Sequence, residues 1–350
     1  MFASFRRSVE LARHYPDLYF VGLLTLNDTR SAFGAATVLG RSWIYNPLVT
    51  ITVFLTQCLS PDHSCREAVS RLIAWRVRNQ MKPCSADTGA YCIARDQLTE
   101  KQCQDLARQT GKQLEDSAPK AWLWLGRRVR IIDGSTVSMP DTEANQAEYS
   151  QQKQQKPGCG FPIARILVVF SLSVGSVVEL LIGPYKGKMT GENTMLRTIH
   201  DQFAKGDVAL VDRLFAGWFD IALRLQQGIK NILQMDHLRC KTPERIRKEF
   251  YMHMLAYNLI RKVMAIAAKE ASVAPYQISF KGALQTLNNF LQSFNRQTDI
   301  EQWCRALINA IGSHRVADRP DRYEPRVRKR RPKPYPLMTK PRNDYKKSIQ

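Results

Sequence analysis

Two apolar segments of the chain end on an aspartate, and these side chains are the first candidates for chemistry. "VRIID" ends on Asp133 and "VALVD" ends on Asp212. Both segments are typical of strands, and ligands of open sheets bind beyond the carboxyl ends of the strands. Two aspartates on neighbouring strands could hold one or two Mg²⁺ ions for phosphodiester chemistry. The alternative is that each aspartate only begins a turn, especially Asp133 before Gly134.

The elements that must position these aspartates indicate an α/β fold. Apolar residues recur at helical spacing in residues 1–125, and again in 233–314. The stretch between them, 126–232, predicts the order strand, hairpin, helix, strand, helix, which gives a mixed sheet with helices packed on it. The predicted strands span 129–133, 164–174, 176–186 and 207–212, with the hairpin turn at Gly175-Ser176.

Several helices can be predicted from apolar spacing and from capping signals. Thr242 and Pro243 begin the longest pattern, in which the apolar stripe from Ile246 to Ala267 is typical of a core-facing helix. The apolar stretch 43–59 carries several polar residues and predicts a buried helix, not a membrane span. The other predicted helices lie within 60–80, 98–117, 190–203, 218–228, 281–294 and 300–313.

The chain is strongly basic. Its 350 residues contain 52 Lys and Arg against 31 Asp and Glu, a formal charge of +21, which favours a polyanionic partner such as nucleic acid. The same charge would suit ribosome association or an anionic membrane surface. The segment 315–350 predicts a disordered basic tail that contacts phosphates, or a solvated terminus without a partner. The eight scattered cysteines lack zinc spacing, as expected of reduced, structural thiols.

Long, ordered blocks of the chain resemble bacterial DDE transposases of the insertion-sequence-4 family. The blocks include "IIDGSTVSMPDTEANQAEYSQQKQQKPGCGFPIARILV", "IGPYKGKMTGE", "VALVDRLF", "LQMDHLRCKTPERIRKEFYMHMLAYNLIR" and "EPRVRKRRPKPYP". The resemblance implies an RNase H-like catalytic core at 126–232, with helical regions before and after it. It also implies Mg²⁺-dependent DNA cleavage and strand transfer in a bacterial cytoplasmic protein that joins the nucleoid when bound to DNA.

The resemblance assigns roles to particular residues. Asp133 and Asp212 become the first two catalytic carboxylates and the ligands of Mg²⁺. Double-stranded DNA is the implied partner, in particular the terminal inverted repeats of a transposable element. The resemblance also allows a homo-oligomer. The implied DNA contacts are Arg213, Lys186, Lys188, Arg328, Lys329, Arg330, Arg331 and Lys333. A solvated loop is the alternative interpretation of the two lysines near 187.

The third carboxylate of the family's site is missing from the expected position. In the family, a Glu within a Tyr-x2-Arg-x3-Glu-x6-Lys signature precedes the block that begins at Leu233. Here that block follows Asp212 almost directly, as though an insertion had been excised near 230–233, and only Glu249 or Asp236 could substitute. The chain is therefore expected to be a catalytically defective transposase-family protein. Its alternatives are a non-catalytic DNA-binding regulator of intact copies and a remnant that folds poorly.

Overall fold

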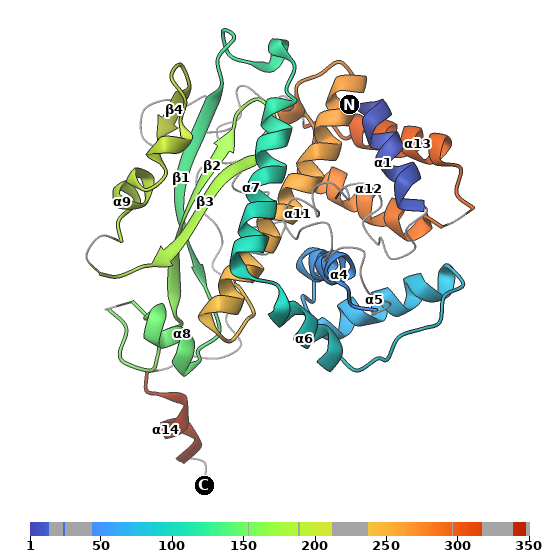
Figure 1. The fold of residues 1–350 in the computed structure, drawn as a ribbon. Coiled ribbons are helices and arrows are strands. Elements are labelled where there is room, and N and C mark those ends of the chain that lie inside the picture. The colour runs from blue at the N-terminus through green and yellow to red at the C-terminus, as the bar shows by residue number, and fades with distance from the viewer. Residues whose placement is uncertain are drawn as a thin grey trace.

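The computed structural model describes residues 1–13, 24, 44–152, 154–187, 190–211, 237–295, 297–316 and 339–347. In these residues, four strands form one mixed sheet in the order β3-β2-β1-β4, and helices flank it (Figure 1). The strands are β1 (Val129–Ser138), β2 (Ile163–Ser171), β3 (Val177–Pro184) and β4 (Val208–Val211). β2 is antiparallel to both β1 and β3, whereas β4 is parallel to β1. The predicted mixed sheet with packed helices is confirmed.

The β2–β3 hairpin closes where the sequence predicts it. Gly175 has a positive φ of 70°, and its N–H donates to the Ser171 carbonyl at 2.7 Å. The Ser171 N–H in turn donates to the Ser176 carbonyl at 2.8 Å. Glycine adopts this left-handed conformation without steric cost, so Gly175 fixes the turn and the register of the two strands.

Helices cover both faces of the sheet. On one face, α9 (Glu192–Arg197) and the short 3₁₀ turn η2 (His200–Gln202) pack over a small apolar cluster that includes Ile132 and Ile199. On the other face, α7 (Glu100–Asp116) and α11 (Pro243–Glu270) close the main core, which contains Ile131. Successive residues of β1 thus point to opposite layers, as strand geometry requires.

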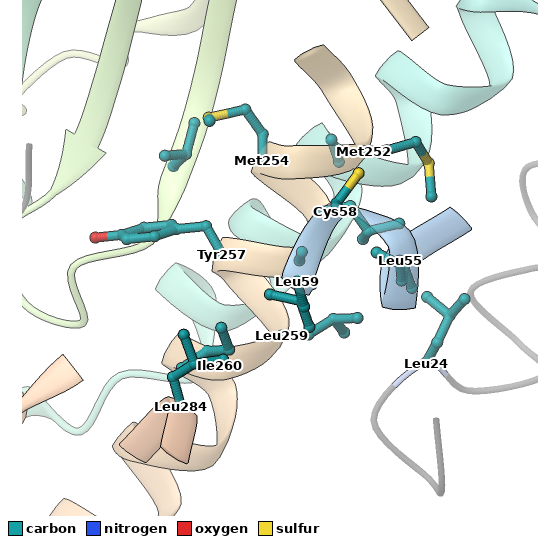
Figure 2. Close-up of a cluster of buried hydrophobic side chains, with 14 of the residues drawn as sticks. Leu24, Leu55, Cys58, Leu59, Met252, Met254, Tyr257, Leu259, Ile260 and Leu284 are labelled. Atoms are coloured by element: carbon teal, nitrogen blue, oxygen red, sulfur yellow. The ribbon is translucent and has the colours of Figure 1, made fainter. Parts of the chain in front are cut away.

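Helix α11 is the centre of the helical half. Pro243 occupies its first turn after Thr242, as predicted, and the predicted stripe from Ile246 to Ala267 is buried. Its neighbours are α4 (Pro47–Leu59), α12 (Phe280–Ser293) and α13 (Ile300–Ser313). Figure 2 shows α4 and α11 side chains meeting in this core, among them Leu55, Cys58, Leu59, Met252, Met254 and Leu259. An apolar helix surrounded in this way is core structure, which confirms the predicted buried helix for residues 47–59 of the range 43–59. None of the helices in the described ranges has the length and apolarity to cross a membrane.

The remaining helices complete the layers around α11. Phe2–Arg13 (α1) packs on α13, while Cys65–Arg78 (α5) and Gly89–Gln97 (α6) pack near α4 (Figure 1). Helix α8 (Glu143–Glu148) follows β1, and α14 (Arg342–Lys347) lies near the carboxyl terminus. Two further 3₁₀ turns, η1 and η4, cover Lys120–Trp122 and Pro275–Gln277.

Some predicted boundaries were wrong. Helix α5 begins after Ser64, whose hydroxyl accepts the Glu67 N–H, and not at residue 60, where the predicted range begins. The helix predicted within 190–203 ends at Arg197 and continues as η2. Residues 342–347 of the expected disordered tail form α14. The predicted helix at 218–228, the rest of the tail from 317 to 338, and the 230–233 junction lie outside the described residues.

Candidate metal and nucleic-acid site

Asp133 does not end its strand. β1 continues to Ser138, and it pairs with β2 along this whole length, from Arg130↔Ser171 through Asp133↔Val168 to Ser138↔Ile163. The prediction that the strand stops on Asp133 was therefore wrong, and so was the turn alternative. The polar run after Asp133 has low intrinsic strand preference, but pairing with the apolar β2 satisfies its backbone groups and overrides that preference.

β4 ends one residue before the second predicted aspartate, Asp212. The last β1–β4 pair is Ile132↔Val211, so Asp133 and Asp212 each directly follow a residue of this pair. Asp133 is half-buried, and its side chain belongs to the face of Ile131 because side chains alternate along a strand. Asp212 and Arg213 themselves lie outside the described residues.

An acidic side chain missed by the sequence interpretation lies against β1 next to Asp133. A Cβ placed on Gly134 would lie only 2.3–2.7 Å from the carboxyl atoms of Glu192, the first residue of α9. Glycine at 134 is thus what allows Glu192 to approach the strand. Because Gly134 belongs to the α9 face and Asp133 to the opposite face, Glu192 supports the backbone beside Asp133 and does not extend its ligand set.

Arg165 holds Glu192 in this position. Its Nη1 donates to Glu192 Oε1 at 3.0 Å, and its guanidinium carbon lies 5.1 Å from the centre of the Tyr185 ring. Within the described part of the chain, the buried Nε of Arg165 has no hydrogen-bond partner. The only sequence signal for this arrangement was that Glu192 ends the family-like block "IGPYKGKMTGE".

The predicted DNA contacts are mostly beyond what the structure describes. Lys186 lies half-buried two residues after the end of β3 and directly follows Tyr185, whose ring Arg165 contacts. The others, Lys188, Arg213, Arg328, Lys329, Arg330, Arg331 and Lys333, lie outside the described residues. Of this set, the structure therefore describes Lys186 alone, and it lies at the end of β3.

Of the two substitutes considered for the third carboxylate, the structure describes only Glu249, and that residue does not join Asp133. Glu249 is buried on α11, where its carboxylate accepts the backbone N–H groups of Arg239 and Cys240, each at 2.9 Å. Burial raises its pKa, and these N–H donors oppose that shift. Asp236 is outside the described residues, but His237 after it pairs with Ser138, the far end of β1. Among the described side chains, no group of three or more His, Cys, Asp or Glu could hold a metal ion.

Comparisons with known protein families, with curated proteins and with solved structures gave no match for this chain. The fold and the site define a mixed α/β protein. Its strand β1 carries the half-buried Asp133 beside the end of the parallel strand β4.

Proposed function

We propose that the chain is a DNA-binding protein of the bacterial DDE transposase type, with an RNase H-like core and an incomplete metal site. One observation carries the proposal: β4 runs parallel to β1 and its last pair, Ile132↔Val211, directly precedes Asp133 and Asp212. Consecutive Cα atoms lie about 3.8 Å apart. Because Asp133 and Asp212 each follow a paired residue in the chain, we infer that the two aspartates come within the reach of a shared pair of ions. The sheet order β3-β2-β1-β4 is compatible with the RNase H-like assignment.

The two predicted carboxylates are the type of ligand that magnesium binds, but two are too few for a pair of ions. Carboxylate oxygens are the protein ligands that Mg²⁺ takes, and two such ions when bound would activate the attacking oxygen and stabilise the leaving one. Asp133 and Asp212 would hold them, and the basic residues of the chain would position the DNA phosphates. With two carboxylates, one ion stays under-coordinated. We therefore expect DNA binding without efficient cleavage.

Cleavage by the purified protein tests the catalytic half of the proposal. The substrate is a duplex that carries the terminal repeats flanking the gene, incubated with Mg²⁺ and followed on a denaturing gel. The expected result is no Mg²⁺-dependent nicking, with Asp133→Asn indistinguishable from the unmodified protein. Clear cleavage that Asp133→Asn abolishes would show a complete site and overturn the assignment of a defective one.

A second candidate function is a non-catalytic regulator that competes with intact transposase copies for the element ends or joins them in inactive oligomers. The net charge of +21 favours this candidate, because it supports binding whether or not cleavage occurs. Binding to terminal repeats and to random duplex is compared at several salt concentrations. Salt-sensitive binding that prefers the repeats supports regulation, whereas equal affinity for both sequences argues against it.

A further inference from the structure

A cavity of about 230 Å³ lies between α6 and the segment that leads into α11. Its wall carries four cationic side chains, Arg95, Arg239, Lys241 and Arg245, against one carboxylate, Asp96. Asp96 is already engaged, since Arg245 Nε donates to its Oδ1 at 2.8 Å and Arg245 Nη2 to its Oδ2. The cavity wall is therefore positively charged beyond what its own carboxylate balances.

Arg95 is the buried member of this wall. It is 9% exposed, and its Nη1 donates to Gln57 Oε1 at 2.9 Å and to Cys65 Sγ at 3.4 Å. Its Nη2 donates to Cys240 Sγ at 3.2 Å, and its guanidinium carbon lies 4.3 Å above the Phe54 ring centre. All of these are neutral groups, because burial raises the pKa of both thiols.

The nearest buried carboxylate does not pair directly with this arginine. Glu249 exerts an electrostatic influence on Arg95, but its oxygens accept the backbone N–H groups of Arg239 and Cys240. A buried cation is costly unless an anion is paired with it. Arg95 thus has hydrogen-bond partners but lacks a bonded counter-ion among the described residues, and the open space next to it is the cavity.

The mouth of the cavity adds exposed positive charge. Arg239 and Lys241 are exposed, and neither forms an ion pair within the described part of the chain. Helix α11 begins at Pro243, between Lys241 and Arg245, so the positive end of its dipole lies beside the cavity. Small-molecule sites usually occupy about 300–1,000 Å³, which leaves room here for a single compact anion and not for a nucleoside.

We propose that this cavity binds one phosphate group, held by Arg95 at its base and by Arg239 and Lys241 at its mouth. The group is either free phosphate or one phosphate of a nucleic-acid backbone. The site goes beyond the proposed function, since it uses neither Asp133 nor any metal ion and lies between α6 and α11, away from the β1–β4 pair.

Calorimetric titration of the full-length chain with inorganic phosphate tests the site. The double variant Arg239→Gln/Lys241→Gln removes the two exposed cations that form no ion pair with any described residue and leaves Arg95 and Arg245 in place. The matched control, Lys269→Gln/Lys281→Gln, removes the same charge at exposed positions that do not line the cavity. We expect the dissociation constant for phosphate to rise at least tenfold in the first variant and to change less than twofold in the second. Absence of phosphate binding, or equal weakening in both variants, overturns the proposal.

Thiol labelling locates the bound anion independently. Cys92 is half-buried in the cavity wall, whereas Cys159 is half-buried in the loop before β2 and outside it. Phosphate should slow alkylation of Cys92, mapped by mass spectrometry, and leave Cys159 unchanged. Equal rates with and without phosphate at Cys92 contradict the site.

The same two measurements, repeated with DNA in competition with phosphate, identify the source of the phosphate group. A 20-base-pair duplex of random sequence that displaces phosphate and protects Cys92 assigns the site to the DNA backbone. A duplex that does neither assigns it to free phosphate. These measurements need no magnesium and no cleavage, so they can succeed where the proposed transposase function fails, and the reverse.

Discussion

The polar contact between α11 and the sheet gives the sharpest stability prediction. Asn258 is fully buried in α11, and its Oδ1 accepts the Val177 N–H at 2.8 Å. Its Nδ2 donates to the Val177 carbonyl at 2.9 Å and to the Ala107 carbonyl of α7 at 3.0 Å. One amide thus joins α11, α7 and the first residue of β3, so we expect Asn258→Ala to be strongly destabilising.

The magnitude follows from the groups that lose their partner. In Asn258→Ala, the N–H and carbonyl of Val177 are left buried without a side-chain partner, while Ala107 keeps its own helical bond to residue 111. Each orphaned buried group costs about 1–3 kcal/mol. The free energy of unfolding should fall by about 4 kcal/mol, a large share of the 5–15 kcal/mol that is typical of folded proteins.

Urea denaturation followed by circular dichroism at 222 nm measures this loss. With a urea dependence of about 3 kcal/mol per molar, the midpoint should fall by more than 1 M. The control is Asn289→Ala on α12, where the asparagine is exposed and the expected change stays within about 0.5 kcal/mol. A midpoint for Asn258→Ala as close to the unmodified protein as that of the control would refute the reasoning.

Three further variants test other parts of the same framework. Gly111→Ala would place a Cβ 1.7 Å from the Val177 carbonyl oxygen, so α7 must move off β3; we expect a loss of about 1–3 kcal/mol, measured in urea. Glu115→Ala removes the 2.6 Å partner of buried Arg130, which keeps Asp207 at 3.6 Å, so it should cost about 1–3 kcal/mol, most of which the apolar pair Glu115→Leu/Arg130→Met should restore. Burial lowers the pKa of His253 to about 3, so the imidazole stays neutral in the folded protein, whereas in the unfolded chain it becomes protonated below about pH 6.5. The contribution of His253 to the free energy of unfolding therefore keeps its full value above about pH 6.5. It falls as the pH drops from there toward 3, by up to about 1.4 kcal/mol per pH unit. In His253→Leu, the urea midpoint should therefore fall less between pH 7 and pH 5 than in the unmodified protein, and an equal fall in both would contradict this assignment.

The sequence predicted best those elements whose apolar pattern is strong. The stripe from Ile246 to Ala267 needed no tertiary information, because a face apolar at helical spacing can only be buried against other elements. The same holds for α7, where the Thr99 hydroxyl and the Gln102 side chain form a capping box that fixes the helix start. Local chemistry and global packing agree in these helices.

The errors lie where tertiary pairing decides. The run from Asp133 to Thr136 is polar, and only its pairing with the apolar β2 makes it strand. Arg165 and Glu192 are 27 residues apart, so their ion pair across β1 has no local signature. The proposed phosphate cavity likewise combines residues of α6 with residues that precede α11, and no sequence motif predicts that these two segments come together.

The metal site is incomplete if no further carboxylate reaches β1. The segment 212–236, which links the end of β4 to His237, contains three aspartates and no glutamate. Of these, Asp212 is the predicted ligand, and Asp236 precedes a residue paired with Ser138, about 17 Å along β1 from Asp133 at the usual rise per residue. Glu192 lies on the other face of the sheet, and Glu249 is bound to backbone N–H groups. To become a third ligand, Glu192 or Glu249 would have to leave an established contact, and this is why we propose binding without efficient cleavage.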